Sequence, residues 1–222
     1  MTQLARLEVQ PAAADGGSSS SLAPRLLRKY PERVTGAFVV PAREGCFVAL
    51  PDALPERLAA ALRSRGRERL YSHQGACWDA VARGEDVVVV TPTASGKSLC
   101  YTLPVVAGAM IRRSKALYLF PTKALAQDQV AELIELSKAG ELGVRAATFD
   151  GDTPGDQRQA IRLSGDIVVT NPDMLHQGIL PHHTKWAQFF ENLAYVVIDE
   201  IHAYRGVFGS HLANVLRRLQ RV

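Results

Sequence analysis

The stretch "DVVVVTPTASGKSLC", residues 86–100, decides how the rest of the chain is interpreted. An uninterrupted apolar run leads into a loop of small residues, and a helical pattern starts at Ser98. A strand, a glycine-containing loop and a helix in this order bind phosphate, because backbone N–H groups and the positive helix end point at one place. The usual motif begins with glycine and ends in Gly-Lys-Ser or Gly-Lys-Thr. Here Gly96, Lys97 and Ser98 are present, but Thr91 leads.

The residues of this loop have distinct expected roles. Gly96 allows close approach of the backbone, Lys97 would reach the β- and γ-phosphates, and the Ser98 hydroxyl would hold Mg²⁺. Thr91 costs little in place of glycine if its backbone angles are ordinary. The alternative is a helix cap beside a chance lysine, and the strand and helix around the loop argue against it. The residues expected to bind ATP here are Thr93, Ala94, Ser95, Gly96, Lys97 and Ser98.

Further apolar runs, separated by helical patterns, predict the fold. Strands that are apolar throughout and alternate with helices are typical of a parallel sheet buried on both sides. The sequence therefore predicts an α/β fold with a parallel sheet covered by helices on both faces. The expected strands are residues 86–91, 115–120, 144–150, 166–170 and 194–199, with helices from Ser98 to about Arg112 and over 122–138.

The chain before this region is less regular. Residues 11–24 are rich in Ala, Gly, Ser and Pro, so residues 1–29 are expected to be a flexible tail. Residues 30–69 are expected to form an irregular lead-in, with one or two edge strands and a short helix in "PERLAAALRSRG". The phosphate loop then lies in a main domain over residues 70–222.

The composition excludes some classes of protein but does not identify the function. A chain of 222 residues can bury one good core, and a net charge of +4 permits a polyanionic partner without requiring one. The three cysteines are widely spaced and form neither a disulfide framework nor a paired metal motif. The amino terminus lacks the apolar core of a secretion signal, and no run is long enough to span a bilayer. We expect a cytoplasmic protein with no membrane partner.

The end of the last expected strand, "VVIDEIH" (196–202), carries two carboxylates. Asp199 and Glu200 follow the strand at the edge where parallel sheets bind ligands. In Mg²⁺-dependent nucleotide hydrolysis one carboxylate holds the metal, usually through water, and another deprotonates the attacking water. We therefore expect Asp199, with Ser98, to hold Mg²⁺, Glu200 to act as the base, and Lys97 to complete the catalytic set.

Together these motifs resemble the superfamily 2 helicases in their DEAD/DEAH-like form. "DEIH" (199–202) is similar to motif II, "LYSHQ" (70–74) to the Q motif, "FPTKALAQDQ" (120–129) to motif Ia, and "FDGDTP" (149–154) to motif Ib, with "TNPDML" (170–175) following. Over residues 70–222, the sequence most resembles the DNA-repair helicases of the MrfA/YprA and Hrq type. The resemblance implies a RecA-like P-loop domain, ATP-driven translocation on single-stranded DNA, and a role in DNA repair.

The resemblance also implies roles for single residues. Gln74 would read the adenine edge, and His202 would couple the nucleotide site to the nucleic-acid side. Residues at helix starts and loops beyond the strands would hold the DNA backbone, as a motor that does not read sequence requires. The alternative is that these are ordinary helix caps, a role that Thr and Asn fill by preference. The residues expected to contact nucleic acid are Thr122, Lys123, Gly151, Thr170 and Asn171.

The resemblance implies further parts that this sequence does not contain. The family's motors have a second RecA-like domain with an arginine finger, and this branch adds a C-terminal zinc region. Because that arginine stabilises transition-state charge from across a cleft, we expect residues 1–222 alone to bind ATP·Mg weakly and to lack unwinding activity. Single-stranded or partly duplex DNA is the expected partner of the complete protein.

Two other functions remain open from the residues. One is a different P-loop enzyme, such as a transporter ATPase or a small-molecule kinase. The absence of an LSGGQ-like signature and the glutamine motif before the loop argue against it. The other is a stand-alone half motor that binds nucleotide or nucleic acid for regulation, without catalysis.

Overall fold

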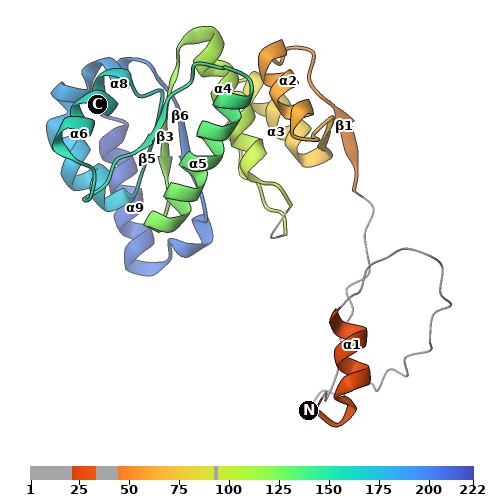
Figure 1. The fold of residues 1–222 in the computed structure, drawn as a ribbon. Helices are drawn as coiled ribbons and strands as arrows, with labels where there is room; N and C mark the ends of the chain where they lie inside the picture. Colours follow the sequence, from red (N-terminus) through yellow and green to blue (C-terminus); the bar gives the residue numbers. More distant parts are fainter. Residues whose placement is uncertain (1–21, 34–44, 93–94) are drawn as a thin grey trace. The chain divides into compact units, whose positions relative to one another are not determined.

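The computed structural model describes residues 22–33, 45–92 and 95–222, and the chain divides into compact units of residues 1–44 and 45–222 (Figure 1). The first unit contains α1 (Leu22–Lys29) and a short 3-10 turn (Pro31–Arg33). The sequence does not predict α1, although two basic residues in its last turn suit a helix carboxyl end. The rest of the expected tail lies outside the described residues, and the limits at residues 29 and 69 stay predictions.

A four-stranded parallel sheet forms the centre of the second unit. Its strands are β3 (Lys115–Leu119), β4 (Ala146–Thr148), β5 (Ile167–Thr170) and β6 (Leu193–Ile198), in the spatial order β4-β5-β3-β6. All four agree with the expected runs within a few residues. The register pairs Leu119 with both Thr170 and Ile198, so three strands end in one row.

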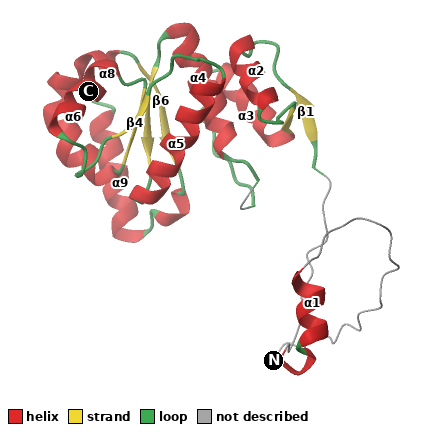
Figure 2. Cartoon of the chain, in the orientation of Figure 1, coloured by secondary structure: helices red, strands yellow, loops and turns green. Residues whose placement is uncertain are grey.

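Helices cover both faces of this sheet, as expected (Figure 2). Side chains alternate along β3: Ala116 and Tyr118 enter one core, with α2, α4 and α5, whereas Leu117 and Leu119 enter the other, with α6, α8 and α9. The helices are α2 (Glu56–Ser64), α3 (Ser72–Ala82), α4 (Ser98–Arg112), α5 (Lys123–Ala139), α6 (Gly155–Ser164), α7 (Pro172–Met174), α8 (Ala187–Glu191) and α9 (Gly206–Leu219). Short helical turns lie at Leu175–Ile179, Leu180–Trp186 and Ile201–Ala203.

The lead-in segment supplies a small second sheet. β1 (Phe47–Ala49) pairs antiparallel with β2 (Arg69–Tyr71), which confirms an edge strand before Pro55. The predicted short helix is α2, whose Leu58 and Leu62 are fully buried. Within the described ranges, no helix combines the length and the apolar character needed to cross a bilayer.

The strand predicted at residues 86–91 is wrong. These residues belong to neither sheet, and Val88 and Val90 are 76% and 88% exposed. β6 is the edge strand that could receive them, but it pairs only with β3. An apolar run indicates that its side chains tend to be buried, whereas a strand also requires a hydrogen-bond partner for its backbone. No partner for this segment is present in the described part of the chain.

The central strand sets the stability of this unit, which gives a direct test. Leu117→Ala removes a fully buried side chain between the sheet and α9, and we expect the free energy of unfolding to fall by about 3 kcal/mol. Leu163→Ala, at a 61% exposed position on α6, should change it by about 0.5 kcal/mol or less. Urea unfolding followed by circular dichroism measures both. Equal losses for the two variants would contradict the position of the core.

Candidate active site

Gly96 makes the predicted phosphate loop possible in two ways. Its backbone φ is +74°, in the left-handed region, and a Cβ placed there would lie 2.8 Å from Gln74 Nε2. Earlier in the loop, the hydroxyls of Thr91 and Ser95 lie 2.6 Å apart and close it across its base. The expected contributions of Thr93 and Ala94 lie outside the described residues. A side chain at position 96 is therefore disfavoured both by backbone conformation and by space.

The Gln74 side chain is hydrogen-bonded to this loop. Its Nε2 donates to the Gly96 carbonyl at 2.8 Å, and its Oε1 accepts from the backbone N–H of Tyr71 at 2.9 Å. The side chain is buried, so the amide joins the start of α3 to the phosphate loop. The expected contact between Gln74 and adenine stays a prediction. The structural role of the amide is an addition that the sequence does not indicate.

Lys97 and Ser98 stand at the start of α4, as the motif predicts. The Lys97 ammonium donates to the carbonyls of Thr91 and Pro92, each at 3.0 Å. These two carbonyls belong to the loop itself, so the ammonium lies over the loop. Ser98 is the first residue of the helix and is half-buried.

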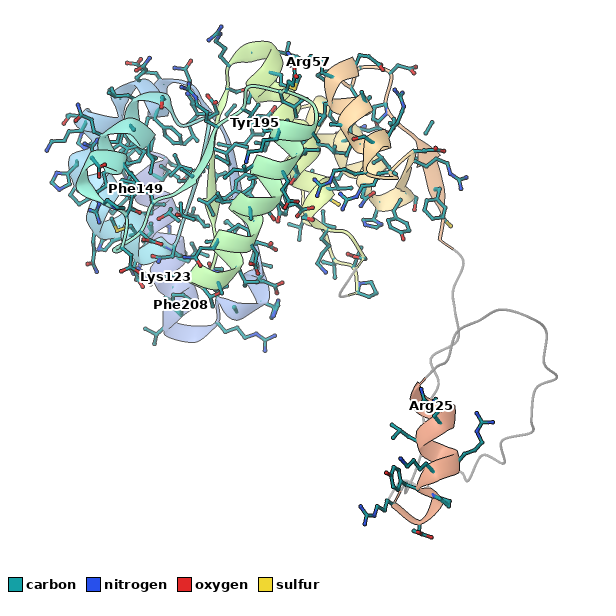
Figure 3. The ribbon with its side chains drawn as sticks, in the orientation of Figure 1. Arg25, Arg57, Lys123, Phe149, Tyr195 and Phe208 are labelled. Carbon is teal, nitrogen blue, oxygen red and sulfur yellow. The ribbon has the colours of Figure 1, made fainter. Side chains whose placement is uncertain are left out.

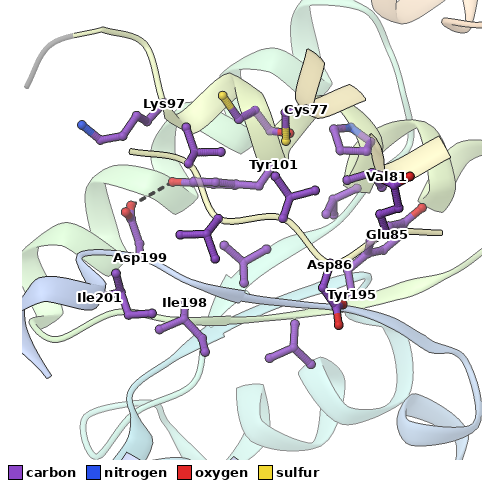
Figure 4. Close-up of a pocket in the computed structure, with 18 of the residues that line it drawn as sticks. Cys77, Val81, Glu85, Asp86, Lys97, Tyr101, Tyr195, Ile198, Asp199 and Ile201 are labelled. Carbon is purple, nitrogen blue, oxygen red and sulfur yellow. Dashed lines mark hydrogen bonds between the residues drawn. The ribbon is translucent and has the colours of Figure 1, made fainter. Parts of the chain in front are cut away.

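Asp199 lies beyond the end of β6 with both carboxylate oxygens engaged. Its backbone N–H continues the sheet by donating to the Leu119 carbonyl at 3.1 Å. Oδ1 accepts from the N–H of Glu200 at 2.8 Å, and Oδ2 accepts from the Tyr101 hydroxyl at 3.0 Å (Figure 4). Burial, and then the negative charge of Asp199, raise the pKa of Tyr101, so its proton remains in place. Sequence reasoning missed Tyr101, whose signal is its position one helical turn after Lys97.

Glu200 adopts the left-handed conformation, with φ of 49° and ψ of 43°. A non-glycine residue in this region costs about 1–2 kcal/mol, and such strain is concentrated at functional sites. The Glu200 carboxylate lies 3.1 Å from Nδ1 of His202, and both side chains are partly exposed. Arg205 donates to the His202 carbonyl at 2.9 Å. The predicted base and the predicted coupling residue are therefore direct neighbours.

A pocket of about 430 Å³ lies between the segment 84–89 and β6. Valines of that segment and apolar residues of β6 form its walls, and Lys97, Tyr101 and Asp199 gather at one end (Figure 4). This end has an ammonium for phosphate and the Asp199 carboxylate, a hard oxygen donor that suits Mg²⁺, and Ser98 follows Lys97 at the start of α4. Among the described residues there is no group of three or more potential metal-ligating His, Cys, Asp or Glu side chains. Mg²⁺ is commonly held by one or two carboxylates together with phosphate oxygens of the substrate, and the Asp199 carboxylate fits such a metal.

Two of the expected nucleic-acid residues cap helices. Thr122 Oγ1 accepts from the N–H of Leu125 at 3.4 Å at the start of α5. Asn171 Oδ1 accepts from the N–H of Met174 at 2.7 Å at the start of α7. These bonds are the cap role that the sequence also allowed. The first turn of α5 is exposed, so its remaining N–H groups are accessible to an anion.

The other three expected residues differ in accessibility. Lys123, at the amino end of α5 (Figure 3), is half exposed, and its ammonium forms an ion pair with Asp152. Gly151 is exposed in the turn after β4. Thr170 is only 2% exposed, and its hydroxyl donates to the Phe149 carbonyl at 2.6 Å. Thr170 therefore supports the neighbouring turn and does not present its side chain to a ligand in this conformation.

The turn over residues 149–153 is held by a residue that sequence reasoning missed. The Arg158 guanidinium donates to the carbonyls of Thr153, Asp150 and Gly151 at 2.8, 2.9 and 3.2 Å. It also lies over the Phe149 ring, 5.4 Å from the ring centre. The exposed turn is thus built by contacts from α6.

The parallel sheet brings both groups of residues to one edge. β4, β5 and β3 lead into the expected nucleic-acid residues, and β6 leads into the two carboxylates. Because all four strands are parallel, these carboxyl ends share the same side of the sheet. A nucleotide and a polyanion could therefore bind next to each other.

Comparison with known proteins gives consistent results. The family model described as DEAD/DEAH box helicase matches residues 71–222. The ATP-dependent helicase YprA of Bacillus subtilis (strain 168) is 54% identical over 192 residues, which are 86% of this chain and 26% of that protein. The ATP-dependent helicase hrq1 of Schizosaccharomyces pombe is 46% identical over 186 residues, 82% of this chain and 18% of that protein.

A solved structure agrees in fold as well as in sequence. The DUF1998 helicase MrfA bound to DNA and AMPPNP aligns with a TM-score of 0.79 and 55% identity. The alignment covers 82% of this chain and 26% of that one. The chain thus spans about a quarter or less of the length of these relatives. Since the family model matches more than half of the residues, the chain belongs to the DEAD/DEAH box helicase family.

Proposed function

We propose that this chain is the first motor domain of an ATP-dependent DNA helicase of superfamily 2, and that the complete protein acts in DNA repair. The observation that carries the proposal is the polar end of the pocket, where Lys97 from the loop and Asp199 from β6 lie together. The MrfA relative, which is 55% identical, was solved with DNA and AMPPNP, an ATP analogue. ATP is thus the proposed substrate and single-stranded or partly duplex DNA the proposed partner.

Each residue of the proposed nucleotide site has a separate role in hydrolysis. Lys97 exchanges its bonds to the Thr91 and Pro92 carbonyls for phosphate oxygens, which are charged and therefore stronger acceptors. Gly96 admits the phosphates close to the backbone. Ser98 and Asp199 would hold Mg²⁺, which, when bound, neutralises charge on the phosphate oxygens. Glu200 accepts a proton from the attacking water at a carboxylate oxygen, after it releases His202.

The proposed DNA contact is a grip on phosphates. The helix start at Thr122–Lys123, the start at Asn171 and the turn at Gly151 offer backbone N–H groups and one ammonium at the same sheet edge. Thr170 contributes indirectly, by holding the Phe149 carbonyl at the base of that turn. Such contacts position nucleic acid without reading bases, which suits a motor that moves along any sequence.

The first prediction tests the nucleotide site. Lys97→Ala in the full-length protein should lower DNA-stimulated ATP hydrolysis by about 100-fold or more, because the ammonium stabilises charge on the transferred phosphate. Lys138→Ala, which changes an exposed lysine at the far end of α5, serves as the control and should retain wild-type rates. A phosphate-release assay with and without single-stranded DNA measures both. Wild-type hydrolysis by Lys97→Ala would rule out the proposed function.

The second prediction tests the DNA grip. Lys123→Ala should weaken binding of single-stranded DNA at every sequence and reduce the slope of log affinity against log salt by about 0.7, since about one phosphate contact is lost. Asp152→Asn should have the opposite effect on affinity, because it releases Lys123 from its ion pair. Fluorescence anisotropy over a salt series measures both. An unchanged slope in Lys123→Ala would show that this ammonium does not touch a phosphate.

The third prediction concerns residues 1–222 alone. We expect weak binding of ATP·Mg, little hydrolysis and no unwinding, because the arginine finger of this family comes from a second domain. Equilibrium binding of a fluorescent ATP analogue and a strand-displacement assay test this. Strong DNA-stimulated hydrolysis by the isolated chain would contradict it.

A further inference from the structure

Tyr101 lies where three functional elements meet. Its hydroxyl is 3.0 Å from Asp199 Oδ2, beyond β6, and 3.0 Å from Gln129 Oε1, on α5. Tyr101 itself belongs to α4, the helix that begins at the phosphate loop. α5 begins at Lys123, in the expected DNA grip. One hydroxyl, carried by the loop helix, therefore contacts both the carboxylate proposed to hold the metal and the helix whose amino end is proposed to contact DNA.

Proton counting defines the direction of these contacts. A hydroxyl has one proton and cannot donate to two acceptors, and the charged Asp199 carboxylate is the stronger acceptor. Gln129 Nε2 is buried and has no hydrogen-bond partner among the described residues, whereas Oε1 faces the hydroxyl. Because the oxygen and nitrogen of an amide are assigned by their surroundings, the opposite assignment is physically preferable. Gln129 then donates to Tyr101, and Tyr101 donates to Asp199.

The ring of Tyr101 is fixed before any ligand binds. It packs edge-on against the fully buried Tyr118, with ring centres 5.3 Å apart and an interplanar angle of 86°. Asp199 is held at its other oxygen by the N–H of Glu200. Each carboxylate oxygen thus accepts one bond and retains a lone pair for Mg²⁺ or a metal-bound water. The two hydrogen bonds therefore orient the carboxylate and still leave it able to bind a metal.

We propose that Tyr101 is a positioning residue that orients Asp199 toward the metal and that, through Gln129, joins Asp199 to α5, so that DNA held at the start of α5 influences the nucleotide site. This inference rests on the proposed function. A movement of α5 would change the Gln129–Tyr101 bond, and with it the direction of the Asp199 carboxylate.

Conservative variants of the full-length protein test the proposal. Tyr101→Phe keeps the packed ring and removes only the hydroxyl, and Gln129→Leu keeps the side-chain volume. The matched control is Tyr118→Phe, which removes a hydroxyl from the fully buried ring that packs against Tyr101 and is not among the residues that line the pocket. The first readout is the Mg²⁺ concentration that gives half-maximal binding of a fluorescent, non-hydrolysable ATP analogue. The second is the ratio of ATPase rates with and without single-stranded DNA.

Tyr101→Phe should raise the half-maximal Mg²⁺ concentration about tenfold, and Gln129→Leu about threefold. The double variant should match Tyr101→Phe within about twofold, because both residues act through one hydroxyl. Both single variants should lower DNA stimulation while their DNA affinity and melting temperature stay at the wild-type values. Tyr118→Phe should match wild type in both readouts.

Three results would overturn the inference: wild-type Mg²⁺ dependence in Tyr101→Phe, an equal shift in Tyr118→Phe, or fully additive effects in the double variant. Lys97→Ala separates this failure from failure of the proposed function. If Lys97→Ala abolishes hydrolysis while Tyr101→Phe behaves as wild type, the function stands and the positioning role fails. If Lys97→Ala retains DNA-stimulated hydrolysis, the proposed function itself fails.

Discussion

The parallel pairing of β3 with β5 and β6 is the constraint on which the rest of the structure depends. Parallel strands end at the same edge of a sheet, and the shared row of Leu119, Thr170 and Ile198 sets where each following loop begins. Asp199 extends this row by one more hydrogen bond to Leu119. A shift of one residue in β6 would turn its side chains to the opposite faces and would move Asp199 away from Tyr101.

The phosphate loop depends on neighbours in the same way. The Gln74 amide from α3 and the Thr91–Ser95 contact hold the loop in place. The Lys97 ammonium donates to a backbone carbonyl of the same loop. The preceding residues 86–91 have no strand partner in the described part of the chain. One wall of the pocket is therefore β6, which is paired in the sheet, and the opposite wall is the unpaired segment with the exposed Val87 and Val88.

The parts of the fold that could be predicted are those governed by local pattern. β5 is a short run that is buried throughout and β3 is buried after its first residue, and such runs have few alternatives once helices flank them. α4 begins at Ser98 and ends at Arg112 as expected, because the loop motif and the pattern of apolar residues mark its ends. The run at 86–91 has the same local pattern and yet is not a strand, since pairing depends on what lies beside it and not on its own residues.

By itself, the sequence determined the fold class, the loop Gly96–Lys97–Ser98, the acidic pair Asp199–Glu200 and the order of the motifs along the chain. These features are short and continuous, so the chemistry of neighbouring residues is sufficient to identify them. Only the tertiary structure decided that Gln74 supports the loop, that Thr170 is buried, that Arg158 holds the turn after β4, and that Tyr101 joins Gln129 to Asp199. Each of these contacts joins residues that are separated along the chain, and hydrogen-bond partners at such separations are set by packing and strand register.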